Sequence, residues 1–326
     1  MKSGWYDAHS AYAIGVDIGG TKINAGIVSR SGEVLYSISF STLAGQTDTG
    51  GRVLEAVQGL LKKLELEQPN LRIRGIGVGS AGQIDWSSGQ IRFASDLIPG
   101  YQGTQLKKMM EEHFSMPVRV DNDVNVLALT EKRFGAGKGI DHFICLALGT
   151  GVGGAIVVDG RLVHGAWGGA GELGHMSVNF QGPLCICGGR GCLEQYASGT
   201  SIARRMREKL EAEGIPVEKV DTREVFARWH AGDRLANAIM EETIAALGTG
   251  IASLIHTFNP GLIVIGGGVA EAGELLFDRL RQEVSNRTMA SMLETVRIEP
   301  AYKGNWGGMI GAALQIWEYA DGGEQL

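Results

Sequence analysis

The sequence predicts an α/β protein of two related lobes, each built around a mixed β-sheet. The main observation is a pattern that occurs twice: an apolar strand enters a glycine-rich turn and leaves as a second apolar strand. The copies are AIGVDIGGTKINAGIV, residues 13–28, and FICLALGTGVGGAIVV, residues 143–158. Strands and amphipathic helices alternate along the rest of each half, and 326 residues suffice for two domains of ordinary size. A hairpin that opens each half predicts antiparallel pairing within otherwise parallel sheets.

The first lobe is expected to span residues 10–120. Its strands are expected at 12–18, 22–29 and 33–40, and a helix follows at 51–66. That helix is predicted from apolar residues at helical spacing, namely Val53, Val57, Leu60, Leu61 and Leu64. A buried strand is expected at 72–78, a short amphipathic helix at 104–114 and a strand at 118–120. The polar stretch in between contains QIDWSSGQIRFA, which alternates and turns like a hairpin.

The second lobe is expected to span residues 121–307 and to begin with a helix at 124–134. The strand, turn and second strand then repeat over 142–158. Helices are expected at 201–212, 222–229, 234–258 and 274–285, with strands at 262–265 and 295–299. A last helix, 308–320, is expected to complete the first lobe. The glycine-rich polar segment 161–198 exceeds the length of ordinary loops, which predicts a functional insert.

The composition describes a globular protein that works in water. Hydrophobic residues make up 44% and charged residues 20% of the chain. The net charge of −6 and the scattered basic residues give no footprint for nucleic acid. The N-terminal MKSGWYDAHS lacks the apolar region of a signal peptide, and no run approaches the roughly 18 apolar residues of a membrane span. We therefore expect a cytoplasmic protein without a membrane or nucleic-acid partner.

Two G-x-G-x-x-G matches do not predict a dinucleotide site. They comprise Gly77, Gly79 and Gly82, and again Gly149, Gly151 and Gly154. The dinucleotide fingerprint must open a helix, whereas strand-like residues follow both matches. The G-x-x-x-x-G-K-[ST] pattern of P-loop proteins does not occur in the chain. These observations exclude the usual dehydrogenases and P-loop enzymes.

The repeated hairpins instead indicate a phosphate-binding function. Glycines let backbone N–H groups approach an anion where a β-carbon would clash. Asp17 ends the first apolar strand, and a carboxylate there is costly to bury unless it meets a cation. Two tight hairpin turns without a ligand are the alternative. The pattern favours a nucleotide-using enzyme whose two lobes close on one polyphosphate in the cleft between them.

Three of the four cysteines are clustered. Cys185, Cys187 and Cys192 lie within eight residues, whereas Cys145 lies in an apolar strand typical of an inert core position. In a cytosolic chain such a cluster favours a metal over disulfides. His175 precedes the cluster with the spacing H-x9-C-x-C-x4-C, which is not that of a classical zinc finger. Free thiols beside a tight turn are the alternative.

Six motifs together resemble the ROK family of repressors, open reading frames and sugar kinases, with its bacterial glucokinase-like branch nearest. They are DIGGTK (17–22), DNDVN (121–125), LGTGVGG (148–154), GELGHM (171–176), CICGGRGCLEQYAS (185–198) and IGGGV (265–269). The motifs run in the family's order, and the resemblance covers residues 13–320. It implies an actin-like, duplicated ribonuclease-H-like fold and transfer of a phosphoryl group from ATP to a sugar.

The resemblance also assigns roles to individual residues. It implies that Asp17 holds Mg²⁺ and that Asp123 is the general base for the sugar hydroxyl. Phosphate contacts are implied for Gly19, Gly20, Thr21, Lys22, Gly149, Thr150, Gly151 and Gly153, and a close approach of adenosine for Gly267 and Gly268. Sugar contacts are implied for Asn122, Gly82, Asp96, Glu172, His175 and Glu194. A role as helix N-cap is the alternative for Asp121, Asn122 and Asp123, but it would explain only one of these three side chains.

The resemblance makes His175, Cys185, Cys187 and Cys192 the ligands of a zinc ion. Three thiolates and one imidazole form a closed tetrahedral site, which is structural because no position is left for water. If His175 binds zinc through one ring nitrogen and sugar through the other, the metal fixes the orientation of the ring. Zinc would then order the sugar site without taking part in the reaction.

Three positions depart from the family pattern. Ala81 replaces a common proline in the loop 79–82, and Asp121 stands where glutamate is more frequent. Asp96 stands where glucose-phosphorylating relatives often have asparagine, which favours a different hydroxyl pattern or an amino group. Glucose is therefore the first expectation for a hexose 6-kinase, and mannose, fructose, an N-acetylated hexosamine such as N-acetylmannosamine, and a β-glucoside stay open.

Two functions of another class are also considered. A sugar-responsive repressor of the family carries a helix-turn-helix domain, for which the sixteen residues before Asp17 are too few. A sugar sensor without catalysis is disfavoured because Asp17 and Asp123 are both present. Polyphosphate is conceivable as a second phosphoryl donor. A homodimer is common among relatives, so we expect one here.

Overall fold

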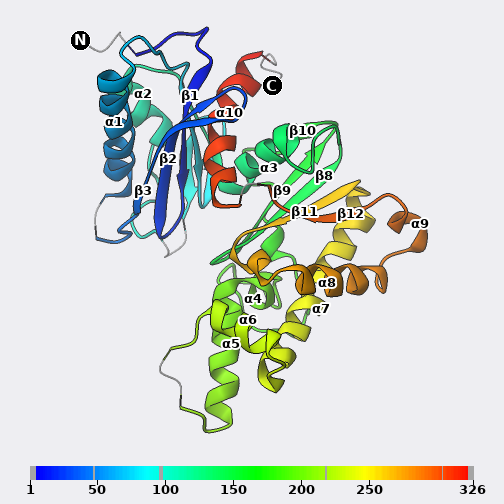
Figure 1. Ribbon diagram of the computed structural model, residues 1–326. Coiled ribbons are helices and arrows are strands. Elements are labelled where there is room, and N and C mark those ends of the chain that lie inside the picture. Colours follow the sequence, from blue (N-terminus) through cyan, green and yellow to red (C-terminus); the bar gives the residue numbers. More distant parts are fainter. Residues whose placement is uncertain (1–4, 47, 95–97, 217–218, 303, 322–326) are drawn as a thin grey trace. The chain divides into compact units, whose positions relative to one another are not determined.

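The computed structural model describes residues 5–46, 48–94, 98–216, 219–302 and 304–321 (Figure 1). Contacts divide the chain into two compact units. The first comprises Met1–Lys138, Leu162–Ala170 and Asn305–Leu326, and the second comprises Gly139–Arg161 and Gly171–Gly304. The chain therefore returns to the first unit twice after it has entered the second.

The first unit is built on a five-stranded mixed sheet with the order β3-β2-β1-β4-β7. The central strand β1 pairs antiparallel with β2 and parallel with β4, as the first glycine hairpin predicts. β3 continues the antiparallel side, and β7 continues the parallel side. The strands are β1 (Tyr12–Ile18), β2 (Lys22–Ser29), β3 (Val34–Ser41), β4 (Ile76–Ser80) and β7 (Val118–Asn122).

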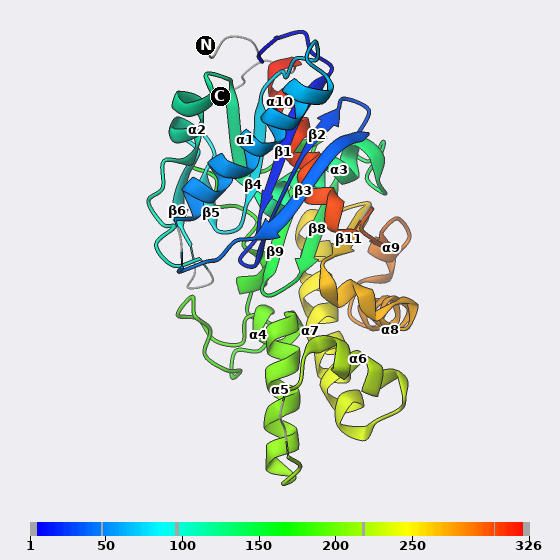
Figure 2. The same cartoon turned by 60° about the vertical axis from the view of Figure 1, so that its left-hand side comes forward.

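Helices cover both faces of this sheet because side chains alternate along β1. Ile14, Val16 and Ile18 pack in one core with α1 (Thr49–Glu67), whereas Ala13 packs in another with α10 (Gly307–Asp321). Figures 1 and 2 show α1 and α10 on opposite sides of the strands. Glycine is required on the α10 side, where an added Cβ at Gly15 or Gly77 would overlap the helix backbone.

Helix α3 (Asp123–Phe134) packs against α10 as closely as strands β1 and β4 do. A Cβ at Gly311 would overlap the carbonyl oxygen of Val126, and Thr130 Oγ1 donates a hydrogen bond of 2.6 Å to the carbonyl of Gly307. The remaining elements of this unit are α2 (Leu106–Phe114) and the hairpin of β5 (Gln83–Asp85) and β6 (Gln90–Phe93). Helix α3 therefore begins directly after β7, the strand at the parallel edge.

The second unit repeats the same arrangement of strand directions. Its sheet has the order β10-β9-β8-β11-β12, with β8 antiparallel to β9 and β11 parallel to both β8 and β12. The strands are β8 (Phe143–Leu148), β9 (Val152–Val158), β10 (Arg161–Leu162), β11 (Leu262–Gly266) and β12 (Arg297–Pro300). The prediction of an α/β protein with two mixed sheets and a duplicated hairpin is confirmed.

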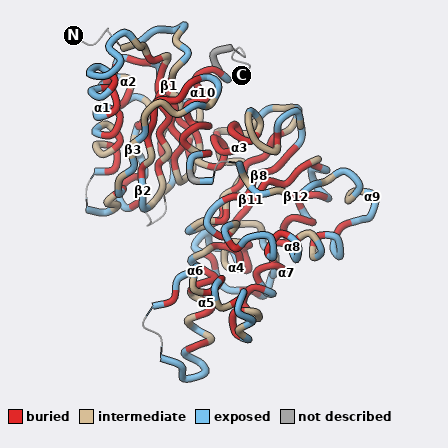
Figure 3. The backbone as a smooth tube through the Cα atoms, viewed as in Figure 1, coloured by how far each residue is buried: buried red, intermediate tan, exposed pale blue. Residues whose placement is uncertain are grey.

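Helices and short 3₁₀ turns complete the second unit, and Figure 3 shows its buried backbone along the strands and α7. Helix α7 is the one described helix that is long and apolar enough to cross a membrane, but most of its apolar stretch is buried inside the protein. It is therefore a core helix. The elements are η1 (Leu173–His175), α4 (Glu194–Ala197), α5 (Gly199–Ala212), α6 (Thr222–His230), α7 (Arg234–Phe258), η2 (Gly268–Ala272), α8 (Glu274–Ser285) and α9 (Ala290–Leu293). The turn η3 (Gly304–Trp306) begins at the last residue of the second unit and continues into the first.

A few strand and helix boundaries differ from those expected from the sequence. The strand expected at 72–78 begins only at Ile76, where β1 and β7 both pair with it, and Ile73 forms a single bridge to Tyr6. The insert 161–198, expected to be irregular, contains η1 and ends in the short helix α4. Helix α9 was not predicted.

Candidate active site and metal centre

Asp17 lies next to the end of β1, on the face of the sheet that α10 covers. Its carboxylate lies so close to Gly308 that a Cβ there would be 2.9 Å from Cγ, and Asn24 Nδ2 lies 3.4 Å from Oδ2. Burial, and next the negative charge of Asp123, raise the pKa of Asp17 from its ordinary value of 3.8 to about 7, and the hydrogen bond from Asn24 opposes this rise. A carboxylate in such surroundings is stabilised by a cation.

The first glycine turn joins β1 to β2. Gly19 donates its N–H to the carbonyl of Lys22 at 2.9 Å, which closes the hairpin. Thr42, which is fully buried, holds the turn from outside: its Oγ1 donates to the carbonyl of Gly19 at 2.7 Å and its N–H to the carbonyl of Thr21 at 3.0 Å. Sequence reasoning missed Thr42, because only the fold brings it to the turn.

Asn122 is the N-cap of α3 and Asp123 is the first residue of that helix. The side-chain oxygen of Asn122 accepts hydrogen bonds from the N–H groups of Val124 at 2.8 Å and Asn125 at 3.4 Å. Its Nδ2 donates to the carbonyl of Gly82 at 3.1 Å. The helix start thus fixes both Asn122 and the backbone of Gly82 beside the residue proposed as the base.

Gly82 and Asp96 were both expected near the sugar. Gly82 has a φ of +100°, and a Cβ there would lie 2.5 Å from the carbonyl oxygen of Phe93, so the backbone itself requires glycine. Asp96 lies outside the described residues.

Asp121 is a buried carboxylate whose two oxygens both have partners. Oδ1 accepts from the N–H of Asn122 at 2.7 Å and from Asn125 Nδ2 at 2.8 Å. Oδ2 lies 2.7 Å from Nε2 of His164, whose ring stacks on Trp86 at a centroid distance of 4.7 Å. Sequence reasoning did not identify His164. A histidine between two glycine-rich stretches was the only available signal.

The second glycine turn joins β8 to β9. Gly149 donates its N–H to the carbonyl of Gly151 at 2.9 Å, and its own carbonyl accepts from Gly199 at 2.8 Å. Thr150 is exposed at the tip, and Gly153 follows within β9 opposite Ala147. Glu194, the first residue of α4, reaches this hairpin and accepts from the N–H of Val152 at 3.0 Å.

The glycines expected near adenosine differ in what they require. Gly267 has a φ of +84°, and a Cβ there would lie 2.5 Å from the carbonyl oxygen of Leu148, so the fold explains this glycine. Gly268 has no atom within 4 Å of the position that a Cβ would occupy. Of these two glycines, Gly268 is therefore the one that no close contact within the described chain explains.

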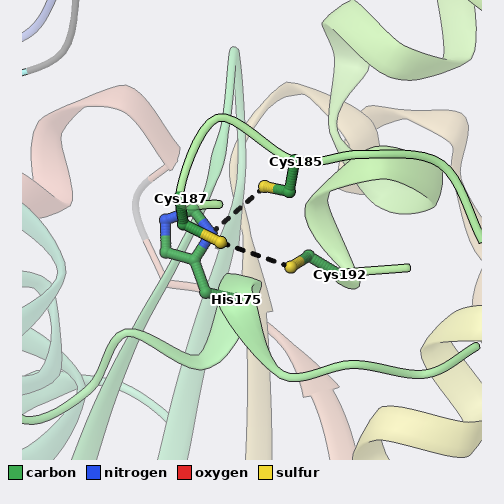
Figure 4. Close-up of side chains that lie close together, drawn as sticks. All are labelled: His175, Cys185, Cys187 and Cys192. Atoms are coloured by element: carbon green, nitrogen blue, oxygen red, sulfur yellow. Dashed lines mark hydrogen bonds between the residues drawn. The ribbon is translucent and has the colours of Figure 1, made fainter. Parts of the chain in front are cut away.

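The four predicted metal ligands converge in the second unit (Figure 4). One ligand atom from each of His175, Cys185, Cys187 and Cys192 lies within 4.8 Å of the others. Cys185 Sγ lies 3.6 Å from His175 Nδ1, and Cys187 Sγ lies 3.5 Å from Cys192 Sγ. Around a tetrahedral zinc with ordinary bond lengths, ligand atoms stand about 3.5 to 3.8 Å apart. The cluster is therefore consistent with a structural zinc site.

The thiols of this cluster influence one another strongly. The N–H of Gly189 lowers the pKa of Cys187, whereas burial and then the neighbouring Cys187 and Cys185 raise the pKa of Cys192 to about 12. Several thiolates cannot be held this close together unless a cation compensates their charge. The donor set thus favours binding of a soft divalent metal over three free thiols.

The imidazole of His175 has different neighbours on its two nitrogens. Nδ1 faces Cys185, whereas Nε2 lies 3.8 Å from Oε2 of Glu172. Both residues are half-buried, and His175 ends the 3₁₀ turn that Glu172 precedes. One nitrogen is thus directed at the cluster, and the other is directed at the second residue expected to bind sugar.

Comparisons with known proteins agree with these features. The chain belongs to the ROK family, whose model matches residues 13–318. It is 38% identical over 320 residues to a glucokinase of Thermotoga maritima, covering 95% of this chain and 98% of that one. A ROK family glucokinase from Streptomyces griseus, solved with glucose and AMPPNP, matches with a TM-score of 0.80 and 32% identity over 93% of this chain and 98% of that chain.

The family also contains regulators. A putative xylose repressor of Caldicellulosiruptor is 31% identical over 297 residues, covering 88% of this chain and 73% of that protein. The family resemblance expected from the motifs is confirmed, and so is the fold. Kinases and repressors share it, so the choice between them depends on the chemistry of individual residues.

Proposed function

We propose that the protein is an ATP-dependent kinase that phosphorylates the 6-hydroxyl of a hexose, with glucose as the expected substrate. The observation that carries this proposal is the relation of Asp17 to Asp123. Asp17 on β1 lies in register with Gly79 on β4, and Gly79 lies in register with Asp121 on β7, the strand from which α3 begins at Asp123. The charge of Asp123 accordingly contributes to the raised pKa of Asp17. Phosphoryl transfer to a hydroxyl needs one group to hold the cation and another to accept the hydroxyl proton.

Asp123 is assigned as the general base. Its position at the first residue of α3 is fixed by the Asn122 cap, which holds the carboxylate at the N-terminal end of the helix. The ionised carboxylate would accept the proton of the attacking hydroxyl. Asp17 is assigned to Mg²⁺, which would neutralise the phosphate charges of the nucleotide.

The two glycine turns are assigned to the phosphates of ATP. Support comes from Gly149, where the chain leaves free space at the Cβ position and does not need a positive φ, so that a ligand approaching the backbone would explain the glycine. Phosphate contacts are likewise proposed for Gly19, Gly20, Thr21, Lys22, Thr150, Gly151 and Gly153. Gly267 and Gly268 are proposed to let adenosine approach the backbone, and Gly268 has the same free space at its Cβ position.

Sugar recognition is assigned to side chains that retain hydrogen-bonding capacity. Asn122 Nδ2 uses one donor on Gly82 and has a second, and Glu194 uses Oε2 on Val152, which leaves Oε1 for a hydroxyl. Glu172 and His175 Nε2 form the remaining pair. Zinc on the other nitrogen of His175 would hold this ring in place.

The wider assignments follow from the same proposal. We propose a cytoplasmic homodimer. The lobes of each chain, expected at 10–120 with 308–320 and at 121–307, correspond to the two compact units, except that contacts extend the first unit to Lys138 and add Leu162–Ala170 to it. The named glucokinase relatives, at 32–38% identity, support glucose over other hexoses. Asp96 keeps mannose, fructose, an N-acetylated hexosamine and a β-glucoside in the panel of substrates to be tested.

The test is ADP release with Mg²⁺-ATP against this panel of sugars, with Asp123→Asn alongside. We expect turnover that depends on one sugar and falls by about 10²–10⁴-fold in the variant. Calorimetry should find that the variant still binds the sugar. If a sugar binds to the wild type without turnover, the kinase proposal fails and a sensor or repressor function takes its place.

A further inference from the structure

A nine-residue loop of the first unit is inserted between two stretches of the second. Residues 162–170 pack with the first unit, although residues on both sides of them belong to the second. The loop folds around His164, whose carbonyl accepts from the N–H groups of Gly168 at 3.0 Å and Ala170 at 3.1 Å. Two residues after the loop, the chain reaches Glu172.

His164 is held tightly where it meets Asp121. The two side chains are 10% and 3% exposed, and Nε2 lies 2.7 Å from Oδ2. The imidazole stacks on Trp86 with an angle of 18° between the rings, and the N–H of Trp86 donates to the carbonyl of Trp167 in the same loop at 3.2 Å. The imidazole of His164 thus attaches the loop to the rest of the first unit in two ways, by its face on Trp86 and by its Nε2 at Asp121.

Asp121 transmits this attachment to the start of α3. Its other oxygen holds the N–H of Asn122 and the side chain of Asn125, and Asn122 caps the helix that Asp123 begins. If the bond from His164 is lost, a buried carboxylate oxygen loses its partner, which is costly enough to favour rearrangement of the turn. Misplacement of a reacting group by about 1 Å can cost about 100-fold in rate.

We propose that His164 is a positioning residue of the phosphoryl transfer: through Asp121 it holds the turn that presents Asn122 and Asp123. In the sequence, the same loop leads directly into Glu172 and His175, which are proposed to bind sugar. This inference rests on the proposed kinase function. It assigns no contact with substrate to His164.

Two substitutions separate the hydrogen bond from the stacking. His164→Phe keeps a ring on Trp86 but removes the donor, whereas His164→Gln restores a donor near the position of Nε2 without the ring. We expect His164→Phe to lower kcat by about 10–100-fold with the KM for ATP within about twofold, and His164→Gln to recover most of the loss. The matched control is His142→Phe, at an exposed His–Asp pair 3.6 Å apart in the second unit.

Amide hydrogen exchange gives a readout that does not require turnover. The N–H groups of Val124 and Asn125 donate to the cap oxygen of Asn122, so they should exchange faster in His164→Phe and at the wild-type rate in His142→Phe. If no sugar supports turnover in the wild type, the kinase proposal fails and the exchange data still decide the role of His164. Wild-type kcat and exchange in His164→Phe overturn the inference. Failure of His164→Gln to recover kcat overturns it as well.

Discussion

Glu194 Oε2 accepts a hydrogen bond of 3.0 Å from the backbone N–H of Val152. The same oxygen lies 2.6 Å from the position that a Cβ of Gly151 would occupy. Helix α4, which starts two residues after the predicted metal ligand Cys192, is therefore joined to the second glycine turn. A residue expected to bind sugar also supports the hairpin expected to bind phosphate.

This relation predicts different results for two substitutions of Glu194. Glu194→Ala removes the acceptor of the Val152 N–H, so we expect a stability loss of about 1 kcal/mol together with a raised KM for sugar. Glu194→Gln keeps an amide oxygen for Val152 and should preserve stability while still raising the KM for sugar. Thermal unfolding and steady-state kinetics measure the two effects. An unchanged sugar KM in both variants would remove Glu194 from the sugar site.

The free space at Gly149 predicts a loss of nucleotide binding without a loss of stability. Gly149→Ala meets no atom within 4 Å, so the free energy of unfolding should stay within about 0.5 kcal/mol. A methyl group that faces the phosphates should lower the affinity for ATP by about tenfold, which corresponds to about 1.4 kcal/mol.

The control for Gly149 is Gly59→Ala, a substitution with equal space in helix α1. It should stabilise the protein by about 0.5–1 kcal/mol through helix propensity and leave the KM for ATP unchanged. Unaltered ATP binding in Gly149→Ala would indicate that the second turn is only a hairpin.

The raised pKa of Asp17 predicts that the metal-free protein becomes less stable as the pH rises. With a pKa of about 7 in the folded chain and 3.8 ordinarily, the folded state binds the extra proton between these values. Stability should therefore fall from about pH 4 to pH 7 and then level off, by up to about 4 kcal/mol. Asp17→Asn should lack this fall and be more stable than wild type at pH 8, although it should lose kinase activity.

Asp85 provides the control of opposite sign. Burial raises the pKa of this carboxyl, but hydrogen bonds from Ser87 and Ser88 outweigh that effect and lower it. Asp85→Asn should therefore lower stability at pH 8 and have no such effect below the folded-state pKa. Urea unfolding across the pH range measures both variants. Equal pH dependence of Asp17→Asn and wild type would contradict the assignment of a raised pKa to Asp17.

Zinc removal should disrupt the sugar site. We expect one zinc per chain by elemental analysis, and loss of it on chelation or in Cys187→Ser. Either change should lower the midpoint of thermal unfolding and weaken sugar binding, because His175 loses its fixed orientation. Cys145→Ala is the control, since this buried cysteine lies in β8 outside the cluster. Zinc-free protein with full activity would refute the proposed role.

Much of the fold could be predicted because its signals are local. The turns at Gly19 and Gly149 and the apolar strands around them follow from glycine chemistry and alternation. The metal set was predicted because His175 and the cysteines are close in sequence, and the structure brings all four together. Thr42 and His164 were missed because each meets its partner only after distant segments have packed.

The sequence by itself determined the two mixed sheets, the family and the His/Cys cluster that is consistent with a zinc site. Each of these depends on residue type and spacing within short segments, where steric and hydrogen-bonding preferences act directly. Only the tertiary structure decided that Asn122 caps α3 while it holds Gly82, that Glu194 supports the second glycine turn, and that His164 pairs with Asp121. These contacts join residues at least 40 positions apart, and the burial that makes them strong exists only in the folded chain.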